Sequence, residues 1–307
     1  MITYADDPAV EPKKETALSK RAMLAVLTIR TWSASKYDRK VSDEVAERHS
    51  ASQNAGRYRK SLLPQESTSL EKVKKAATAA REWHYKNTLP WSQDGSRILP
   101  KDNYFNYVEA MRKFRQEFEA ASAEFLQEYP QAVQLSKTLL GDLWRPEDYP
   151  NIAGIASKFS FDNLFLPFPD EKDFRVDIAE GEVKAIKRAI MKQQHAAVES
   201  AMRDCWNRLY EAVSHAVTKL SDPEAGFRDS LIRNLEDLCG ILPRLNIAED
   251  AHLEEMVEQV RQKLAGISPK KLRENLEARS TTAQDAAGIL EMMKAYMPGQ
   301  TKDEVSA

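Results

Sequence analysis

The chain has 307 residues, of which 42% are hydrophobic and 30% charged, with only 10 glycines and a formal net charge of −2 at pH 7. A chain of this length can bury a sizeable core in one large domain or two ordinary ones, and its low glycine content disfavours an all-β sandwich, which needs many turns. No apolar run reaches the roughly 18 residues that a membrane span needs, so we expect no spanning segment.

The N-terminal part of the sequence predicts one strand and one helix. Residues 1–20 are acidic and lack the apolar segment of a signal peptide, so we expect a disordered lead-in and a cytoplasmic protein. Ala22–Trp32 is rich in β-branched residues without helical spacing, which predicts a strand. A polar, basic helix is expected to begin at Ser42 and to run towards Leu62, before Pro64.

Two longer helices are predicted next, with a loop between them. Apolar residues share one side of the segment that begins near Ser69, which predicts a helix, and residues 88–100 are expected to form the loop. Over Tyr104–Tyr129, apolar residues recur at steps of three and four, which is typical of long helices that pack antiparallel. Pro130 is expected to break this helix, and a short helix should follow up to Gly141.

The centre of the chain changes to a period of two, which indicates a hairpin with a long connection over Lys158–Ile178. Phenylalanines alternate with polar residues at its start, and Phe174, Val176 and Ile178 alternate with charged residues at its end. Because two strands alone are marginally stable in water, we expect them to pair with the Ala22–Trp32 strand in a small sheet.

The C-terminal part of the chain is predicted to be helical throughout. The segment from Glu182 to about Leu220 has no proline or glycine and carries an apolar stripe, which predicts a helix roughly 55–60 Å long. Asp222 and Pro223 should end it and open another helix, which Gly240 closes. Three further helices are expected at Leu253–Leu264, Pro269–Arg279 and Thr282–Met297.

These elements predict a mainly α fold, an elongated bundle of long antiparallel helices with a small antiparallel β-sheet made of the N-terminal strand and the central hairpin. Residues 20–115 hold 20 Lys and Arg against 10 Asp and Glu, whereas residues 116–307 hold 23 against 33. We therefore expect four regions, namely a disordered lead-in (1–20), a basic helical region with the sheet (21–178), an acidic long-helix region (179–298) and a disordered tail (299–307).

No motif in the sequence identifies a catalytic site. Phosphate-loop, dinucleotide-binding, HExxH, CxxC and GxSxG patterns are absent, so we expect a non-catalytic protein with no cofactor and no metal. Cys205 and Cys239 lie among apolar neighbours and are expected to be buried, reduced thiols. The pairs His195/Glu199 and Glu211/His215 each share a helix face, but such pairs arise often by chance in charged helices.

The basic region interleaves cations with aromatic residues, a composition that favours nucleic acid. Cations neutralise phosphates and release counterions, while exposed aromatic rings stack on unpaired bases. The candidate nucleic-acid-binding residues are Lys36, Arg39, Lys40, Arg57, Tyr58, Arg59, Lys60, Lys86, Trp91 and Arg97. Alternatively, the same cations form a solvated face, or dock onto the acidic region within one chain or between copies.

Several short segments also suggest a family, and they are Thr31-Trp32-Ser33-Ala34, Thr88-Leu89-Pro90-Trp91, Arg97-Ile98-Leu99-Pro100 before Tyr104, and Asp173-Phe174-Arg175-Val176. Together they resemble an uncharacterised family of phage, prophage and plasmid proteins known only as a domain of unknown function. The resemblance covers Ala22–Ile178 and implies a mobile-element setting, with a role in DNA metabolism or host takeover in the host cytoplasm. It supplies no catalytic residues.

Three functional hypotheses follow from the sequence. The first is a non-catalytic, phage-type accessory protein that binds nucleic acid, preferably single-stranded DNA or RNA, through residues 36–97. The alternative is a helical protein–protein adaptor, a scaffold that self-assembles through its basic and acidic regions, or an inhibitor of a host protein. The third is a helical-bundle metalloenzyme, whose ligands would be His195, Glu199, Glu211 and His215.

Overall fold

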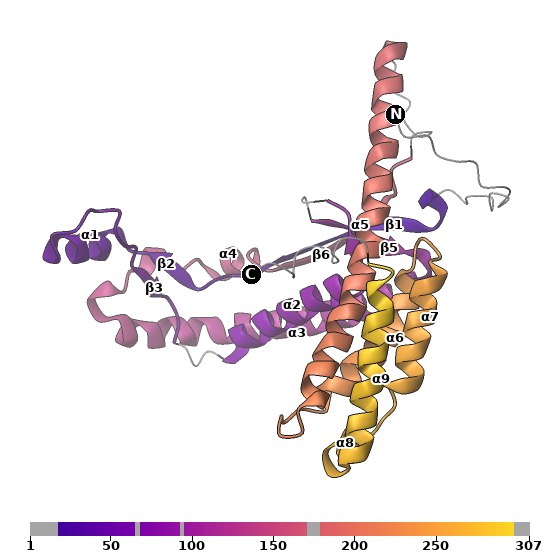
Figure 1. Ribbon diagram of the computed structural model, residues 1–307. Helices are drawn as coiled ribbons and strands as arrows, with labels where there is room; N and C mark the ends of the chain where they lie inside the picture. The colour runs from indigo at the N-terminus through magenta and orange to yellow at the C-terminus, as the bar shows by residue number, and fades with distance from the viewer. Residues whose placement is uncertain (1–17, 65–67, 93–94, 171–178, 298–307) are drawn as a thin grey trace. The chain divides into compact units, whose positions relative to one another are not determined.

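A computed structural model describes residues 18–64, 68–92, 95–170 and 179–297 of the chain (Figure 1). The protein is mainly α-helical with a small β-sheet, as the sequence predicts. The described residues form two compact units, each built from separate stretches of sequence. Unit 1 draws on Met1–Ala25, Asn87–Tyr104 and Phe165–Ala307, and unit 2 draws on Val26–Lys86 and Phe105–Leu164.

These units do not coincide with the contiguous regions that the charge pattern predicts. Residues 87–104 lie between two helices of the predicted basic region, yet they belong to unit 1 together with the C-terminal helices. Of the predicted lead-in, the structure describes only the last residues, where Leu18–Lys20 forms a 3₁₀ turn. The predicted tail over 299–307 lies outside the described residues.

The sheet has four strands in the order β4-β5-β1-β6. They are β1 (Ala22–Arg30), β4 (Leu89–Pro90), β5 (Ser96–Pro100) and β6 (Ser160–Pro167). The predicted pairing of the N-terminal strand with the first strand of the central hairpin is therefore confirmed. The predicted second strand, which holds Phe174, Val176 and Ile178, lies outside the described residues.

The prediction of a loop over residues 88–100 is wrong, because this segment forms an antiparallel hairpin. Leu89 pairs with Ile98 and Pro90 with Arg97, and Gly95 has a φ of +91° between the two strands. A strand of two residues that includes a proline shows no period, so pattern analysis misses it. The Asp94-Gly95 dipeptide was the available signal, since this pair favours hairpin turns.

Helices account for most of unit 1, and they pack side by side (Figure 1). The helices are α5 (Glu180–Ser221), α6 (Ser230–Leu245), α7 (Ala251–Lys263), α8 (Pro269–Glu274) and α9 (Leu276–Lys294). Their facing leucines, isoleucines, valines and methionines form one continuous core. The predicted long helix is confirmed in α5, whereas α6 begins after Pro223 and continues through Gly240, contrary to the prediction.

The core of unit 2 is rich in aromatic residues. The helices α2 (Thr68–Lys86) and α3 (Tyr104–Leu140) run antiparallel, since Lys72 pairs with Glu124 near one end and His84 with Tyr107 near the other. Aromatic contacts complete the core, and they include Trp32, which follows β1, with Tyr129, and Phe161 of β6 with Phe118. Trp32 and Trp83 are thereby used in packing.

The predicted break at Pro130 is wrong, because α3 continues through this residue. A proline inside a helix removes one backbone hydrogen bond and leaves the carbonyl four residues earlier without its partner. Pro130 is exposed, so water can hydrogen-bond to that carbonyl. Beyond α3 the chain forms two 3₁₀ turns, Gly141–Leu143 and Pro146–Asp148, and the short helix α4 (Ile152–Ala156).

The predicted helix from Ser42 to Leu62 is replaced by a shorter helix and a strand. Helix α1 (Arg39–Arg48) begins earlier, because the Asp38 carboxylate caps its first turn by accepting a hydrogen bond from the Val41 amide at 3.3 Å. It ends where Ser50 adopts a φ of +51°. There the Ala51 amide donates to Ala46 O at 2.8 Å and the Ser50 amide to Glu47 O at 3.1 Å, the pair of bonds of a Schellman cap.

Both cysteines and the hydropathy of the helices agree with the sequence predictions. Cys205 and Cys239 are free and buried, as predicted, and burial raises the pKa of the Cys205 thiol to about 12 and that of Cys239 to about 11. Among the helices in the described ranges, none combines the length and the hydropathy that crossing a bilayer would take.

Candidate nucleic-acid interface

The candidate residues from Lys36 to Lys60 gather in one part of unit 2, which we call the β2–α1–β3 module (residues 35–61). Its strands β2 (Ser35–Tyr37) and β3 (Arg59–Ser61) pair antiparallel and flank α1 in the sequence. In their register Lys36 lies opposite Lys60, and Tyr37 lies opposite Arg59. Because side chains alternate between the faces of a strand, the two lysines share one face and Tyr37 and Arg59 share the other.

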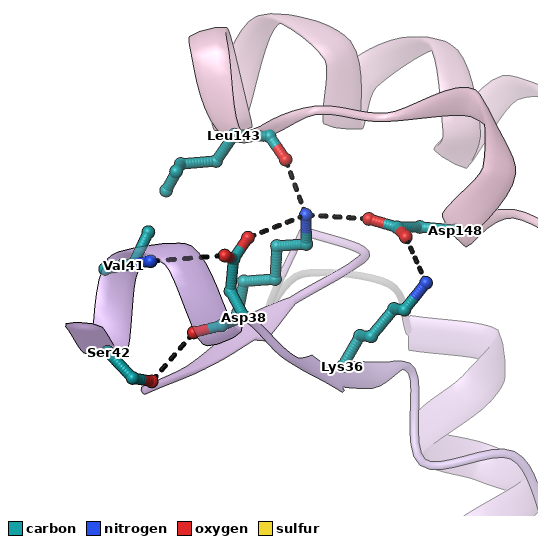
Figure 2. Close-up of polar contacts among 7 residues, drawn as sticks. Lys36, Asp38, Val41, Ser42, Leu143 and Asp148 are labelled. Carbon is teal, nitrogen blue, oxygen red and sulfur yellow. Dashed lines mark hydrogen bonds and ion pairs between the residues drawn. The ribbon is translucent and has the colours of Figure 1, made fainter. Parts of the chain in front are cut away.

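Two lysines at directly opposed positions would repel each other, and Asp148 removes that repulsion. Its Oδ1 lies 2.6 Å from Lys36 Nζ and its Oδ2 lies 2.7 Å from Lys60 Nζ. Asp38 and the Leu143 carbonyl complete the surroundings of Lys60 Nζ, at 3.2 Å and 2.7 Å. Figure 2 shows these groups converging on one ammonium from α1 and from the 3₁₀ turns.

The Lys60 side chain is only 2% exposed, as is that of Asp148, so this is a buried ionic cluster. Burial disfavours the charged form of Lys60, but the hydrogen bonds to Asp148 and Asp38 outweigh it and raise the pKa of Lys60. Burial acts against both carboxylates too, yet the Val41 amide and Lys60 lower the pKa of Asp38, and Lys36 and Lys60 lower that of Asp148. All the charges of the cluster are therefore retained near neutral pH.

The module also presents cations that are not buried. The Arg39 and Lys40 side chains are 80% and 75% exposed, and Arg57 and Arg59 are exposed as well. Arg39 and Lys40 pair with Asp43 and Glu44 one helical turn away, at 3.6 Å and 3.9 Å. Exposed pairs at such distances contribute little to stability, so an external anion can replace them at small cost.

An open cleft of about 470 Å³ lies between the module and the turn that carries Asp148. Its cationic lining comes from both sides, and the residues are Lys36, Arg39, Lys40, Lys60 and Arg145. The N-terminus of α1 opens into the same cleft, because Asp38 and Arg39 line it. Four carboxylates also line the cleft, those of Asp38, Asp43, Glu147 and Asp148, so its five cations leave the lining with a net charge of +1.

Two candidate residues, Trp91 and Arg97, belong to unit 1. Trp91 packs edge-on against Phe168, with ring centroids 4.9 Å apart, and joins the hydrophobic core of that unit. Arg97 Nε donates to Thr88 Oγ1 at 2.7 Å across the β4–β5 hairpin. Lys86 is the last residue of α2 and is half-buried. The structure therefore brings together the candidates from Lys36 to Lys60 and places Trp91 and Arg97 in the other unit, where they contact Phe168 and Thr88.

Sequence reasoning missed the residues that organise the cleft. Asp38 is more than 100 residues from Arg145 and Asp148 in the sequence, and Asp38 and Asp148 read as ordinary charged residues in polar surroundings. Asp38 alone carried a usable signal, since an aspartate before a run of helix-forming residues is a common N-cap. The proximity of Asp148 to Lys60 depends on tertiary structure and leaves no local pattern.

The residues of the metal hypothesis, His195, Glu199, Glu211 and His215, are exposed on α5. Within the described ranges no group of three or more histidine, cysteine, aspartate or glutamate residues has a metal-binding arrangement. Comparison of the chain with protein-family models, with curated proteins and with solved structures finds no match.

Proposed function

We propose that the protein is a non-catalytic nucleic-acid-binding protein whose β2–α1–β3 module binds single-stranded DNA or RNA. One observation carries this proposal: Lys36, Arg39, Lys40, Arg57 and Arg59 are all exposed in one short module, together with Tyr37 and Tyr58. The buried Lys60 is not part of the interface but holds the module against the Asp148 turn.

Electrostatics supplies affinity in such an interface, and aromatic rings supply the preference for single strands. Each phosphate that a lysine or arginine neutralises releases condensed counterions, so binding weakens as salt increases. Exposed tyrosines stack on bases that are unpaired, and a duplex keeps its bases stacked on one another. An accessory role in a mobile element, as the family resemblance implies, would be compatible with this activity.

Fluorescence anisotropy with a labelled single-stranded oligonucleotide, titrated over a range of salt concentrations, tests the proposal. The slope of log K against log salt is negative. We expect its magnitude to decrease by about 0.7 in each of the variants Lys40→Gln, Arg57→Gln and Arg59→Gln, because each removes one cation. Lys75→Gln is the matched control, because Lys75 is an exposed lysine of α2 outside the module. Equal slopes for all four variants and the unmodified protein would refute the assignment of this interface.

A second candidate function, an interaction with another protein, is favoured by two exposed leucines. Leu135 and Leu139 are 57% and 60% exposed and share a face near the C-terminal end of α3. If they mediate self-association, light scattering should detect an oligomer that Leu135→Ser/Leu139→Ser dissociates. An oligomer that dissociates at high salt and is unaffected by these substitutions would instead indicate pairing of basic and acidic surfaces.

A further inference from the structure

A second cavity lies on the other side of α1 within the same module. It has a volume of about 400 Å³ and lies between α1 and the segment 51–58. Its aliphatic lining consists of Val45, Ala46, Ala51 and Ala55. His49, Arg57 and Tyr58 complete it on the same two segments. We call this cavity the α1 groove.

The α1 groove is stabilised by backbone contacts. The Tyr58 amide donates to Ser42 Oγ at 2.9 Å, and Tyr58 O accepts from the Asp38 amide at 3.0 Å. Ser42 Oγ in turn donates to Asp38 O at 2.7 Å, so these bonds join both ends of the segment 38–58. Because the bonds use the backbone of Tyr58, its phenol ring is left partly exposed at the groove.

We infer that the α1 groove accommodates one unstacked nucleobase of the strand whose phosphates bind the neighbouring cleft. This inference rests on the proposed nucleic-acid function and deepens it, because it adds a site for the base to a site for phosphate. The groove lining offers flat groups that stack on a base, namely a phenol, an imidazole and a guanidinium, beside small aliphatic side chains.

The charge of the lining favours a base of an anionic strand over a segment of a basic partner. None of the described residues that line the α1 groove is acidic, while Arg57 contributes a cation. Arg39 and Lys40 line the phosphate cleft and Val45 lines the groove, on one helix. Arg39 and Val45 are separated by about 9 Å along the helix axis at 1.5 Å per residue, so one strand can reach both cavities.

Comparison of an oligothymidylate with an abasic oligonucleotide of the same length tests the inference. The backbone charge of the two probes is equal, so any difference in affinity reports on the bases. We expect the oligothymidylate to bind roughly tenfold more tightly, because a base that stacks on an aromatic side chain adds affinity that the abasic probe cannot gain. Tyr58→Ala should reduce the difference severalfold, since His49 and Arg57 remain in the groove, whereas Tyr58→Phe, which keeps the ring, should preserve it.

Tyr85→Ala is the control variant, since Tyr85 is an exposed tyrosine of α2 that does not line the groove. Equal, salt-dependent affinities for the two probes would overturn the base site and leave the phosphate interface intact. A preference for oligothymidylate that is as large in Tyr58→Ala as in the unmodified protein would likewise overturn the base site. Absence of salt-dependent binding to either probe would instead overturn the proposed function itself.

Discussion

Lys60 is the residue on which the geometry of the module depends most, because it is buried and its ammonium has three partners. We expect Lys60→Met to destabilise unit 2 by about 3–5 kcal/mol, the usual cost of leaving buried charges without their partner. Asp38 would lose its buried cation, while Asp148 would keep Lys36. Hydrogen exchange of the β2 and β3 amides, with and without denaturant, measures this loss.

Lys40→Met is the matched control, because it makes the same chemical change at a side chain that is 75% exposed. We expect its effect on stability to stay within about 0.5 kcal/mol. Similar protection of the β2 and β3 amides in the two variants would show that the cluster does not stabilise the module.

The sequence could not distinguish Lys60 from its neighbours. Arg57, Arg59 and Lys60 form one basic cluster in the sequence, which gives them the same predicted role. In the structure, alternation along β3 sends Arg59 and Lys60 to opposite faces, and only Lys60 meets carboxylates. A strand of three residues is too short for its period to be recognised beforehand.

At the scale of elements, the end of α1 makes a prediction about the loop beside the groove. Ser50 has a φ of +51°, a conformation that is unfavourable for residues with a side chain. We expect Ser50→Gly to stabilise the module by about 0.5–1 kcal/mol, because glycine adopts this conformation without strain. This gain should outweigh the conformational entropy that glycine adds to the unfolded chain. The midpoint of denaturant unfolding, with an unchanged m-value, measures the gain.

The control for this prediction is Ser52→Gly in the same loop. Ser52 does not have a positive φ, so glycine there adds backbone entropy to the unfolded state, removes the long 3.4 Å hydrogen bond from the Asn54 amide to Ser52 Oγ, and should destabilise. If both substitutions shift the midpoint in the same direction, the strain assigned to Ser50 is wrong.

Long elements were predictable, and short ones were not. The apolar stripe of α5 and the aromatic steps of α3 repeat over many turns, so the helical period is clear in the sequence. β2, β3 and β4 have two or three residues each, and tertiary contacts decide their conformation. The end of α1 was also not predictable from the sequence. The polar residues that follow are compatible with a helix, but the hydrogen bonds of the Ser50 and Ala51 amides end it there.

At the scale of the whole molecule, the division into units changes the meaning of the charge asymmetry. Residues 20–115 carry a net charge of +10 when they are counted as one stretch of sequence. Unit 2, however, combines most of that stretch with residues 105–164. Unit 2 as a whole has 19 Lys and Arg against 16 Asp and Glu, a net charge of only +3. Lys36, Lys60 and Lys72 illustrate the neutralisation, since each pairs with a later carboxylate.

Sequence reasoning therefore overestimated the free positive charge of unit 2, and the assignment of an interface to this segment stays a prediction. The sequence also allowed that acidic residues of the same chain neutralise these cations. Within unit 2, some cations are neutralised in this way and others remain exposed. Which cations are neutralised depends on contacts between residues more than 50 positions apart, such as Lys72 with Glu124. The amino-acid composition gives the numbers of charged residues and does not show which of them pair.

The ionic cluster also predicts how the stability of unit 2 depends on pH. The pKa values of Asp38 and Asp148 are lowered, so their contribution is fully present above the ordinary aspartate value of about 3.9 and is lost as the pH falls through the lowered values. The pKa of Lys60 is raised, so its contribution is present below about 10.4 and is lost as the pH rises through the raised value. Between these limits the contribution of the cluster should be constant.

In Lys60→Met, the contribution of Asp38 to the stability of unit 2 should change with the opposite sign as the pH falls below neutrality. Without the ammonium, burial is opposed only by the Val41 amide and Arg145, so the pKa of Asp38 should be higher than in the unmodified protein, and protonation then relieves a poorly paired buried charge as the pH falls. The difference in unfolding free energy between the unmodified protein and the variant should therefore narrow from pH 7 to pH 4, and denaturant titrations at each pH measure it. Because the carboxylates that do not contact Lys60 are common to both proteins, a difference that stays constant would mean that Lys60 is coupled to neither Asp38 nor Asp148.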